Sequence, residues 1–496
     1  MTAALAGAAL LVANALAVRA GRPLFDVLPV TYRYWEDVRA GAASRRPTAD
    51  GAFVPASLDP FTRAVATESD GLGIGVTTFW RSVPFARLPP PATGSITALE
   101  DVGRARLLAV CFRALHGVAP YLLLWIPALL AAPALCALAL GFAAMGRPLA
   151  GIVVSLSIGA SAFFADALFL SYSPVGFYVV ALFMLAAFSA WTAGEGSRAP
   201  RTADFVVAMV AGLALALCAA CRGGVLLLFP GFVAAGLVLA ARRGRASWTA
   251  LVVAALVIAP SVAFRPSESH NVWISVWEGL GDFDLARGHV WSDAAAKRTL
   301  RAAGVDDLRS AAAEATMRGL VLADVRADPP WYAAILARRV RAVVLQEKIA
   351  PGGHALAAAN GPGEGAMDAY YGLTRHADTF AALGGGVELP TWMLWAPLAL
   401  VAALAAGGRR IGLTTDGAAE WRRDMLALAP LAIGALAVPV LISTAGAFET
   451  QAFLIVHSSA AALLVDGAVR AGRGRRGAVR PSVARARSGA PPRDTA

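Results

Sequence analysis

About ten apolar runs, each close to the length of a membrane helix, constrain the fold of this chain more than any other feature. A helix needs about 20 apolar residues to cross the hydrocarbon core of a bilayer. Only 16% of the residues are charged, whereas a soluble domain carries about 25%. The sequence therefore predicts an all-α polytopic membrane protein. The expected spans lie near residues 2–18, 117–140, 149–167, 174–192, 204–221, 224–241, 247–264, 390–407, 425–445 and 449–467.

The arginines fall in short clusters beside these runs, and positively charged connections stay on the cytoplasmic side of a membrane. If the N-terminus is cytoplasmic, every even-numbered connection and the C-terminal tail carry such a residue or cluster, beginning with Arg147. Membrane orientation then explains the net charge of +11, and we expect no nucleic-acid partner. Alanine and arginine are frequent and lysine is scarce, as in proteins from GC-rich bacterial genomes, so we expect a multi-pass protein of a bacterial cell (inner) membrane. The placement of the basic residues predicts that both termini are cytoplasmic.

This topology divides the chain into four parts. Residues 1–264 form a transmembrane module whose first outer loop spans residues 19–116. Residues 265–389 form an extracytoplasmic domain of mixed helix and loop, and residues 390–468 hold the C-terminal transmembrane helices. Residues 469–496 are rich in Arg, Pro and Ser, which is typical of a disordered basic cytoplasmic tail.

The outer domain contains two patterns that favour helix. Residues 291–325 are rich in alanine with charges at helical spacing, and Asp328 with the two prolines after it breaks this pattern. The segment "WYAAILARRVRAVVLQEKIA", residues 331–350, is typical of an amphipathic helix that lies on a membrane surface.

An enzyme on the outer face has no ATP, so its substrate must carry the energy, as a sugar linked to a lipid phosphate does. Transfer needs a carboxylate that takes a proton from the acceptor hydroxyl, and cationic groups or a metal that stabilise the leaving phosphate. The first outer loop supplies Asp26, Glu36 and Asp37, with Tyr34 beside them. The alternative is a solvated juxtamembrane helix with ordinary surface acids.

Two further residues lie near predicted membrane ends. Asp166 stands among apolar residues in "FFADALFL", which is costly unless it faces a cavity or a partner; the alternative is an exposed turn acid. Arg222 in "CRGGVLLLFP" has glycine neighbours that would let a phosphate approach the backbone. The alternative for Arg222 is an arginine that snorkels to the interface.

The stretch "HNVWISVWEGLGDFD" is polar, aromatic and follows an apolar run. Its tryptophans can stack on a sugar ring or pack at the membrane interface, and its acids can bind a metal. The glycines favour a tight turn. The alternative is a structural cap that docks the outer domain on the helices. The candidate substrate-binding residues here are His270, Trp273, Trp277, Asp282 and Asp284.

These residues together resemble a known family. A short first helix precedes an acid and tyrosines in "GRPLFDVLPVTYRYWEDVRAG", an acid follows the third helix, and "ALCAACRGGVLLLFPGFVAAGL" places a basic residue before an apolar run and a proline. The pattern resembles the multispanning GT-C glycosyltransferases that use lipid-phosphate sugars, a group that includes protein O-mannosyltransferases and aminoarabinose transferases. The likeness covers the topology of about the first 300 residues. The 270–284 stretch is also similar to a motif of uncharacterised bacterial membrane proteins of this class.

The resemblance implies a GT-C-like fold in which Asp26 is the catalytic base. The family's usual acidic pair is absent after "PLF", so Glu36 and Asp37 are alternative bases. We expect an inverting glycosyltransferase that moves a hexosyl or pentosyl group from a polyprenyl-phosphate donor. Arg222 would bind the lipid phosphate, and Asp166 would position the acceptor or a divalent metal ion, the candidate cofactor. The alternatives are a cell-envelope lipid transporter or flippase and a non-catalytic scaffold of the same fold.

Overall fold

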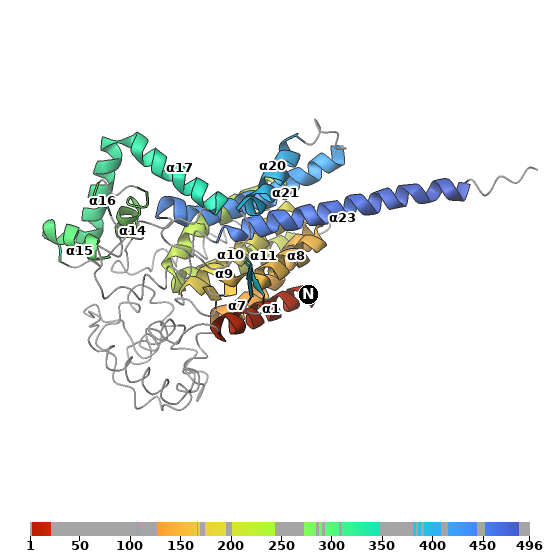
Figure 1. Ribbon diagram of the computed structural model, residues 1–496, viewed down its shortest axis with the longest axis horizontal. Helices are drawn as coiled ribbons and strands as arrows, with labels where there is room; N and C mark the ends of the chain where they lie inside the picture. The colour runs from red at the N-terminus through yellow and green to blue at the C-terminus, as the bar shows by residue number, and fades with distance from the viewer. Residues whose placement is uncertain are drawn as a thin grey trace, which may run out of the picture.

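A computed structural model shows a bundle of apolar helices with a smaller group of polar helices at one end (Figure 1). Figure 1 shows α14, α15 and α16 gathered at this end, with α17 leading from them towards α20 and α21, while α23 leaves the bundle in the opposite direction. The structure describes residues 2–20, 107, 126–165, 167–168, 174–194, 201–243, 272–283, 287–289, 293–306, 310–346, 380–382, 385–387, 391–407, 415–443 and 452–485.

Among these described residues, six helical segments are long and apolar enough to cross a membrane. The helical class predicted for the chain is thereby confirmed, although a two-stranded hairpin, β1 (Phe380–Ala382) and β2 (Gly385–Val387), accompanies the helices. The six segments lie in α7 (Ile126–Ala144), α10 (Pro174–Ala193), α11 (Arg201–Cys221), the 3₁₀ helix η6 (Gly223–Leu228) with α12 (Phe229–Arg243), α21 (Thr415–Leu441) and α23 (Leu454–Arg485).

The expected count of ten spanning helices is not met in the described part of the chain. Three of the expected spans are helices whose apolar parts are shorter: α1 (Thr2–Ala20), α8 (Pro148–Ala160) and α20 (Thr391–Gly407). The helix α8 stops early because the backbone at Ser161 becomes extended, and the short helix α9 (Ala162–Ala165) follows. The run at residues 247–264 lies outside the described residues.

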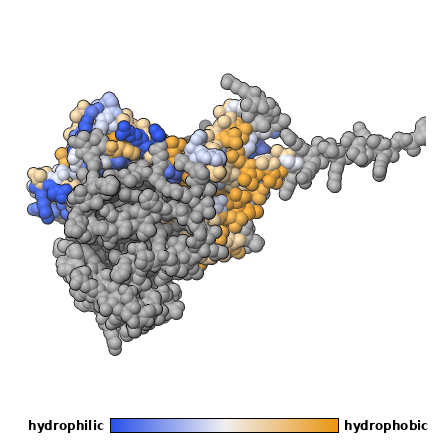
Figure 2. Space-filling model, viewed as in Figure 1, coloured by the Kyte–Doolittle hydropathy of each residue, from blue (hydrophilic) through white to orange (hydrophobic). Residues whose placement is uncertain are grey.

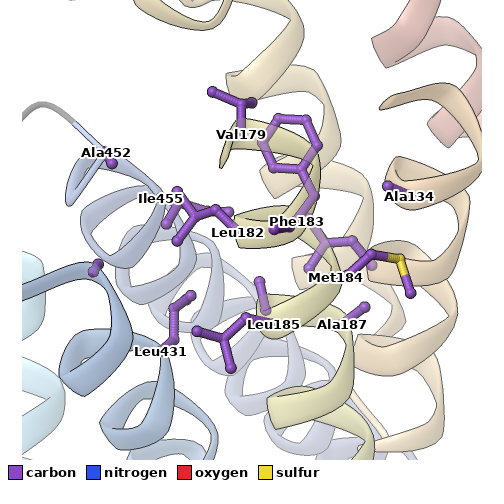
Figure 3. Packing of buried hydrophobic residues seen from close by; sticks show 14 of the residues in the cluster. Ala134, Val179, Leu182, Phe183, Met184, Leu185, Ala187, Leu431, Ala452 and Ile455 are labelled. Carbon is purple, nitrogen blue, oxygen red and sulfur yellow. The ribbon is translucent and has the colours of Figure 1, made fainter. Parts of the chain in front are cut away.

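The helix α10 forms the centre of the bundle. Its segment Gly176–Ala193 is 94% buried, so apolar residues all around the helix meet protein on every side. Figure 3 shows its side chains between α7, which carries Ala134, and α21 and α23, which carry Leu431 and Ile455. A Cβ on Gly141 of α7 would overlap the carbonyl oxygen of Ala187. Small residues therefore set the close spacing of α7 and α10, as they do in membrane bundles generally.

A buried ionic cluster closes one end of the bundle. The guanidinium of Arg147, in the turn between α7 and α8, donates to both carboxylate oxygens of Asp424 on α21 at 3.1 and 2.7 Å. It also reaches Asp466 on α23 at 3.2 Å and Glu420 at 3.3 Å. Arg470 pairs with Asp466 at 2.6 Å. The cluster ties the α7–α8 turn to the two C-terminal helices of the bundle.

The polar helices at the opposite end of the bundle have a hydrophobic core of their own. Its helices are α14 (Val272–Gly279), α15 (Asp293–Ala302), α16 (Ala311–Ala327) and α17 (Pro329–Leu345), named here the α14–α17 region. Hydrophilic residues gather over this region in Figure 2, whereas hydrophobic residues predominate on the coloured surface at the right of the view. Which side of a membrane the region occupies stays a prediction.

Capping residues explain where α16 and α17 begin. The hydroxyl of Ser310 accepts a hydrogen bond from the Ala313 amide at the start of α16. The Asp328 carboxylate accepts one from the Trp331 amide, directly before the two prolines in the first turn of α17. The predicted helical pattern at 291–325 is thus confirmed as two helices, separated by a turn at Gly304, whose φ is +78°.

The helix α17 connects the two cores. Ile335, in its first half, belongs to the core of the α14–α17 region. Val343, near its end, belongs to the core of the bundle. A helix is confirmed at this position, from Pro329 to Leu345, and it packs on α20 and α21. Its predicted place on a membrane surface stays a prediction.

The helix α23 is longer than expected. It continues to Arg485, through most of the stretch where the sequence predicts a disordered tail. Alanine and arginine are good helix formers, and the preceding apolar turns of the same helix supply the nucleus from which it extends. Residues 486–496 lie outside the described part.

Candidate functional site

Arg222 lies at a break between two apolar helices. Its amide donates to the Cys218 carbonyl in the last turn of α11 at 2.8 Å, and its carbonyl accepts from Val225 in η6 at 3.1 Å. Arg222 itself has an extended backbone, with φ −149° and ψ 112°. Its side chain is half-buried and lies close to Gly224, where a Cβ would be 3.7 Å from Nε. The break therefore holds a charged side chain between two segments that are otherwise apolar.

The break lies towards the same end of the bundle as the α14–α17 region. The helix α12 and η6 both pack on α21, and a Cβ on Gly434 would be 3.5 Å from the carbonyl oxygen of Leu228, the last residue of η6. Gly434 is in the C-terminal half of α21, the half that leads to the α14–α17 region. The α21 partners of Arg147, Glu420 and Asp424, lie in the N-terminal half of the same helix.

Asp282 is part of a buried hydrogen-bond network that docks the α14–α17 region on α21. Its Oδ2 accepts from Arg339 Nε at 3.1 Å and its Oδ1 from the Ser443 hydroxyl at 2.6 Å. Arg339 also donates to the carbonyls of Gly279 at 2.6 Å and Val440 at 2.8 Å. Burial lowers the pKa of Arg339, and Asp282 opposes that shift. This network supports the structural-cap alternative for Asp282 rather than direct contact with a substrate.

An imidazole between two indoles forms the centre of the α14–α17 region. His289 is buried, and its Nε2 lies 2.8 Å from the Asp324 carboxylate on α16. The imidazole ring meets Trp277 edge-on at 5.0 Å between centroids and stacks with Trp331 at 6.3 Å. The guanidinium of Arg287 lies over the Trp331 ring, 4.0 Å from its centroid. Burial lowers the pKa of His289 below its ordinary value, and Asp324 partly offsets that effect.

Sequence reasoning missed His289 and named His270 instead. The signal that could have found it is the aromatic pattern: "RGHVW" places a tryptophan two residues after a histidine, and "HNVW" in the earlier candidate stretch places one three residues after His270. Gly288 has a φ of +76°, so the chain turns there and directs the next residue inward. Its partners on α14, α16 and α17 are distant in sequence, and no local pattern indicates them.

Trp273, the second residue of α14, is partly buried against the core of the α14–α17 region. The Glu314 carboxylate accepts from the amides of Val272 and Trp273 at 2.8 and 2.9 Å. An acid at a helix N-terminus satisfies amides that have no partner within the helix. Trp277 is 4% exposed, so its ring packs against protein rather than presenting a face to solvent.

The structure thus brings Trp273, Trp277 and Asp282 together in one region and places Arg222 in another. The remaining candidates lie outside the described residues, so their roles stay predictions: Asp26, Tyr34, Glu36, Asp37, Asp166, His270 and Asp284.

The described residues contain no group of three or more His, Cys, Asp or Glu side chains that could hold a metal ion. The divalent metal expected at Asp166 therefore stays a prediction, since that residue lies outside this part of the chain. No protein-family model, curated protein or solved structure matches the chain.

Proposed function

We propose that the chain is a membrane glycosyltransferase that moves a sugar from a polyprenyl-phosphate donor to an acceptor at the outer face of a bacterial cell membrane. The observation that supports this best is the half-buried Arg222 at the break between α11 and α12. A guanidinium presents five N–H donors in a fixed fork and binds phosphate oxygens in pairs.

The surface that leads to this arginine suits a lipid chain. The helix α11 exposes apolar side chains at helical spacing, so they form one stripe along the helix towards the break. A polyprenyl tail lying along this stripe would bring its phosphate to Arg222 at the end of the span. The stripe consists of Val206, Val210, Leu213 and Leu217.

In the proposed reaction the acceptor hydroxyl attacks the anomeric carbon of the donor sugar. A carboxylate takes the hydroxyl proton, the bond from carbon to phosphate oxygen breaks, and the polyprenyl phosphate leaves with the electron pair. Asp26 is the proposed base, with Glu36 and Asp37 as alternatives. Arg222 stabilises the charge that develops on the leaving phosphate.

Native mass spectrometry of the purified protein with a polyprenyl phosphate tests the proposed donor site. We expect a lipid adduct in the wild type and a loss of affinity of about 10- to 100-fold in Arg222→Ala, because a hydrogen bond to a charged group contributes about 1.5–3 kcal/mol. Arg242→Ala is the matched control, since this exposed arginine lies at the opposite end of α12. Equal adducts in wild type and Arg222→Ala would contradict the donor site.

A second measurement separates transfer from binding. Wild-type protein incubated with a panel of polyprenyl-phosphate hexoses and pentoses should release polyprenyl phosphate, and Asp26→Asn should not. The lipid can bind through Arg222 while no donor in the panel is turned over in the presence of membrane extract. That result would contradict the transferase proposal and leave the alternative that the protein is a lipid carrier.

A further inference from the structure

The end of the bundle near α17 has the features of a boundary between membrane and water. The candidate span in α21 ends at Leu441, and Arg339 on α17 donates to the carbonyl of the preceding residue, Val440, at 2.8 Å. Ile442, the first residue after α21, already packs against the core of the α14–α17 region. The change from one core to the other thus falls at the level of Arg339.

The start of α20 supports the same boundary independently. Trp392 is 56% exposed and Trp395 is 37% exposed, in the first turn or so of a helix that is otherwise apolar. Tryptophan is enriched where membrane helices enter the head-group layer. Because α20 packs against α17, these indoles and the middle of α17 lie at the same end of the bundle.

Two arginines on α17 project outward at this level. Arg338 and Arg341 are exposed, and their spacing of three residues puts them on one helix face. The opposite face carries Arg339 and Val343, which are fully buried. The guanidinium of Arg338 also lies 6.0 Å from the ring of Phe283. The exposed face of α17 is therefore cationic. Packing of the buried face, which carries Arg339 and Val343, holds the helix in this orientation.

We propose that this face, Arg338 and Arg341, binds the phosphates of anionic phospholipids and holds α17 on the membrane surface. Guanidinium groups suit phosphate oxygens in geometry as well as in charge. Val340, which precedes Arg341 and is 38% exposed, adds an apolar contact with the upper part of the acyl chains beside this face. The contact is separate from the donor site at Arg222, which lies on another helix pair.

Native mass spectrometry with phosphatidylglycerol and phosphatidylcholine, titrated separately onto the full chain, tests the proposal. We expect the wild type to retain phosphatidylglycerol preferentially. The double variant Arg338→Ala/Arg341→Ala should bind it about 30-fold more weakly, which is about fivefold for each arginine near a membrane surface. Lysine at both positions should restore most of the binding, and raising the salt concentration should weaken it.

The control pair is Arg318→Ala/Arg326→Ala, two exposed arginines on α16, away from the contacts of α17 with the bundle. This variant should retain phosphatidylglycerol as the wild type does. Equal retention of the two lipids by the wild type would overturn the proposal, and so would an equal loss of binding in the two double variants. Because the donor lipid at Arg222 is probed with a polyprenyl phosphate, failure of one proposal does not decide the other.

Discussion

Gly279 determines how closely α14 can approach the end of α21. A Cβ there would overlap the carbonyl oxygen of Ile442 and would lie 2.9 Å from an Arg339 nitrogen. The sequence "EGLGDFD" predicts a tight turn, and the structure confirms one just after this residue. The sequence could not predict that Gly279 serves a helix contact, because its neighbours come from α17 and α21.

Gly279→Ala should destabilise the protein by about 1–3 kcal/mol, the usual range for forcing an extra methyl group into a packed contact. Thermal unfolding in detergent measures the loss. The matched control is Gly319→Ala on α16, where a Cβ meets nothing within 4 Å. Alanine there should stabilise by up to about 1 kcal/mol, because it is the better helix former. Equal effects at both glycines would show that the Ile442 contact is unimportant.

At the scale of helices, the α14–α17 region is organised around His289 rather than around the candidate stretch alone. Its imidazole contacts Trp277 of α14, Asp324 of α16 and Trp331 of α17. One buried side chain, whose pKa burial lowers, thus contacts three helices. The individual helices could be predicted from alanine content, capping residues and prolines. Their mutual packing could not, because it depends on pairs of residues far apart in the chain.

The α14–α17 region should lose stability as the pH falls below about 6.5, the ordinary pKa of histidine. Burial lowers the pKa of His289 in the folded state, so the unfolded state binds a proton first. The stabilisation that the buried His289 contributes is fully present above about pH 6.5. It is lost as the pH falls towards the lower pKa that His289 has in the folded state. Hydrogen exchange of α14, α16 and α17 at pH 7.5 and 5.5, corrected for intrinsic rates, measures it.

The control for this pH dependence is His289→Gln, which can still bond Asp324 but does not titrate in this range. The variant should show a smaller change in protection between the two pH values than the wild type. An unchanged pH dependence in His289→Gln would assign the effect to another group.

At the scale of the whole molecule, α21 carries a polar network at each end. Asp424 joins Arg147 near its start, and Arg339 joins the Val440 carbonyl near its finish. The positive-inside pattern predicts Arg147 in a cytoplasmic connection, but not that it is buried. Apolar runs alone predict most of the helices of the bundle. The partners of a buried charge can be identified only from the tertiary structure.

Arg147→Ala should destabilise the bundle by about 3–5 kcal/mol, because it leaves Asp424 and Asp466 buried without their shared cation. Glu420→Ala removes a partner of the same arginine whose side chain is 44% exposed, and it should cost less than about 1 kcal/mol. Unfolding of both variants in the same detergent gives the comparison. A loss in Arg147→Ala no larger than in Glu420→Ala would mean that the buried carboxylates are satisfied in another way.

The two networks on α21 also give the protein a preferred hydrophobic thickness. A rise of 1.5 Å per residue places Asp424 and Val440 roughly 24 Å apart along the helix, whereas the hydrocarbon core of a typical bilayer is about 30 Å thick. Both networks link α21 to other helices, so neither can move along the membrane normal without breaking buried hydrogen bonds. A bilayer that is thicker than this span must therefore thin locally around the protein, and hydrophobic mismatch favours partition of the protein into thinner membrane regions.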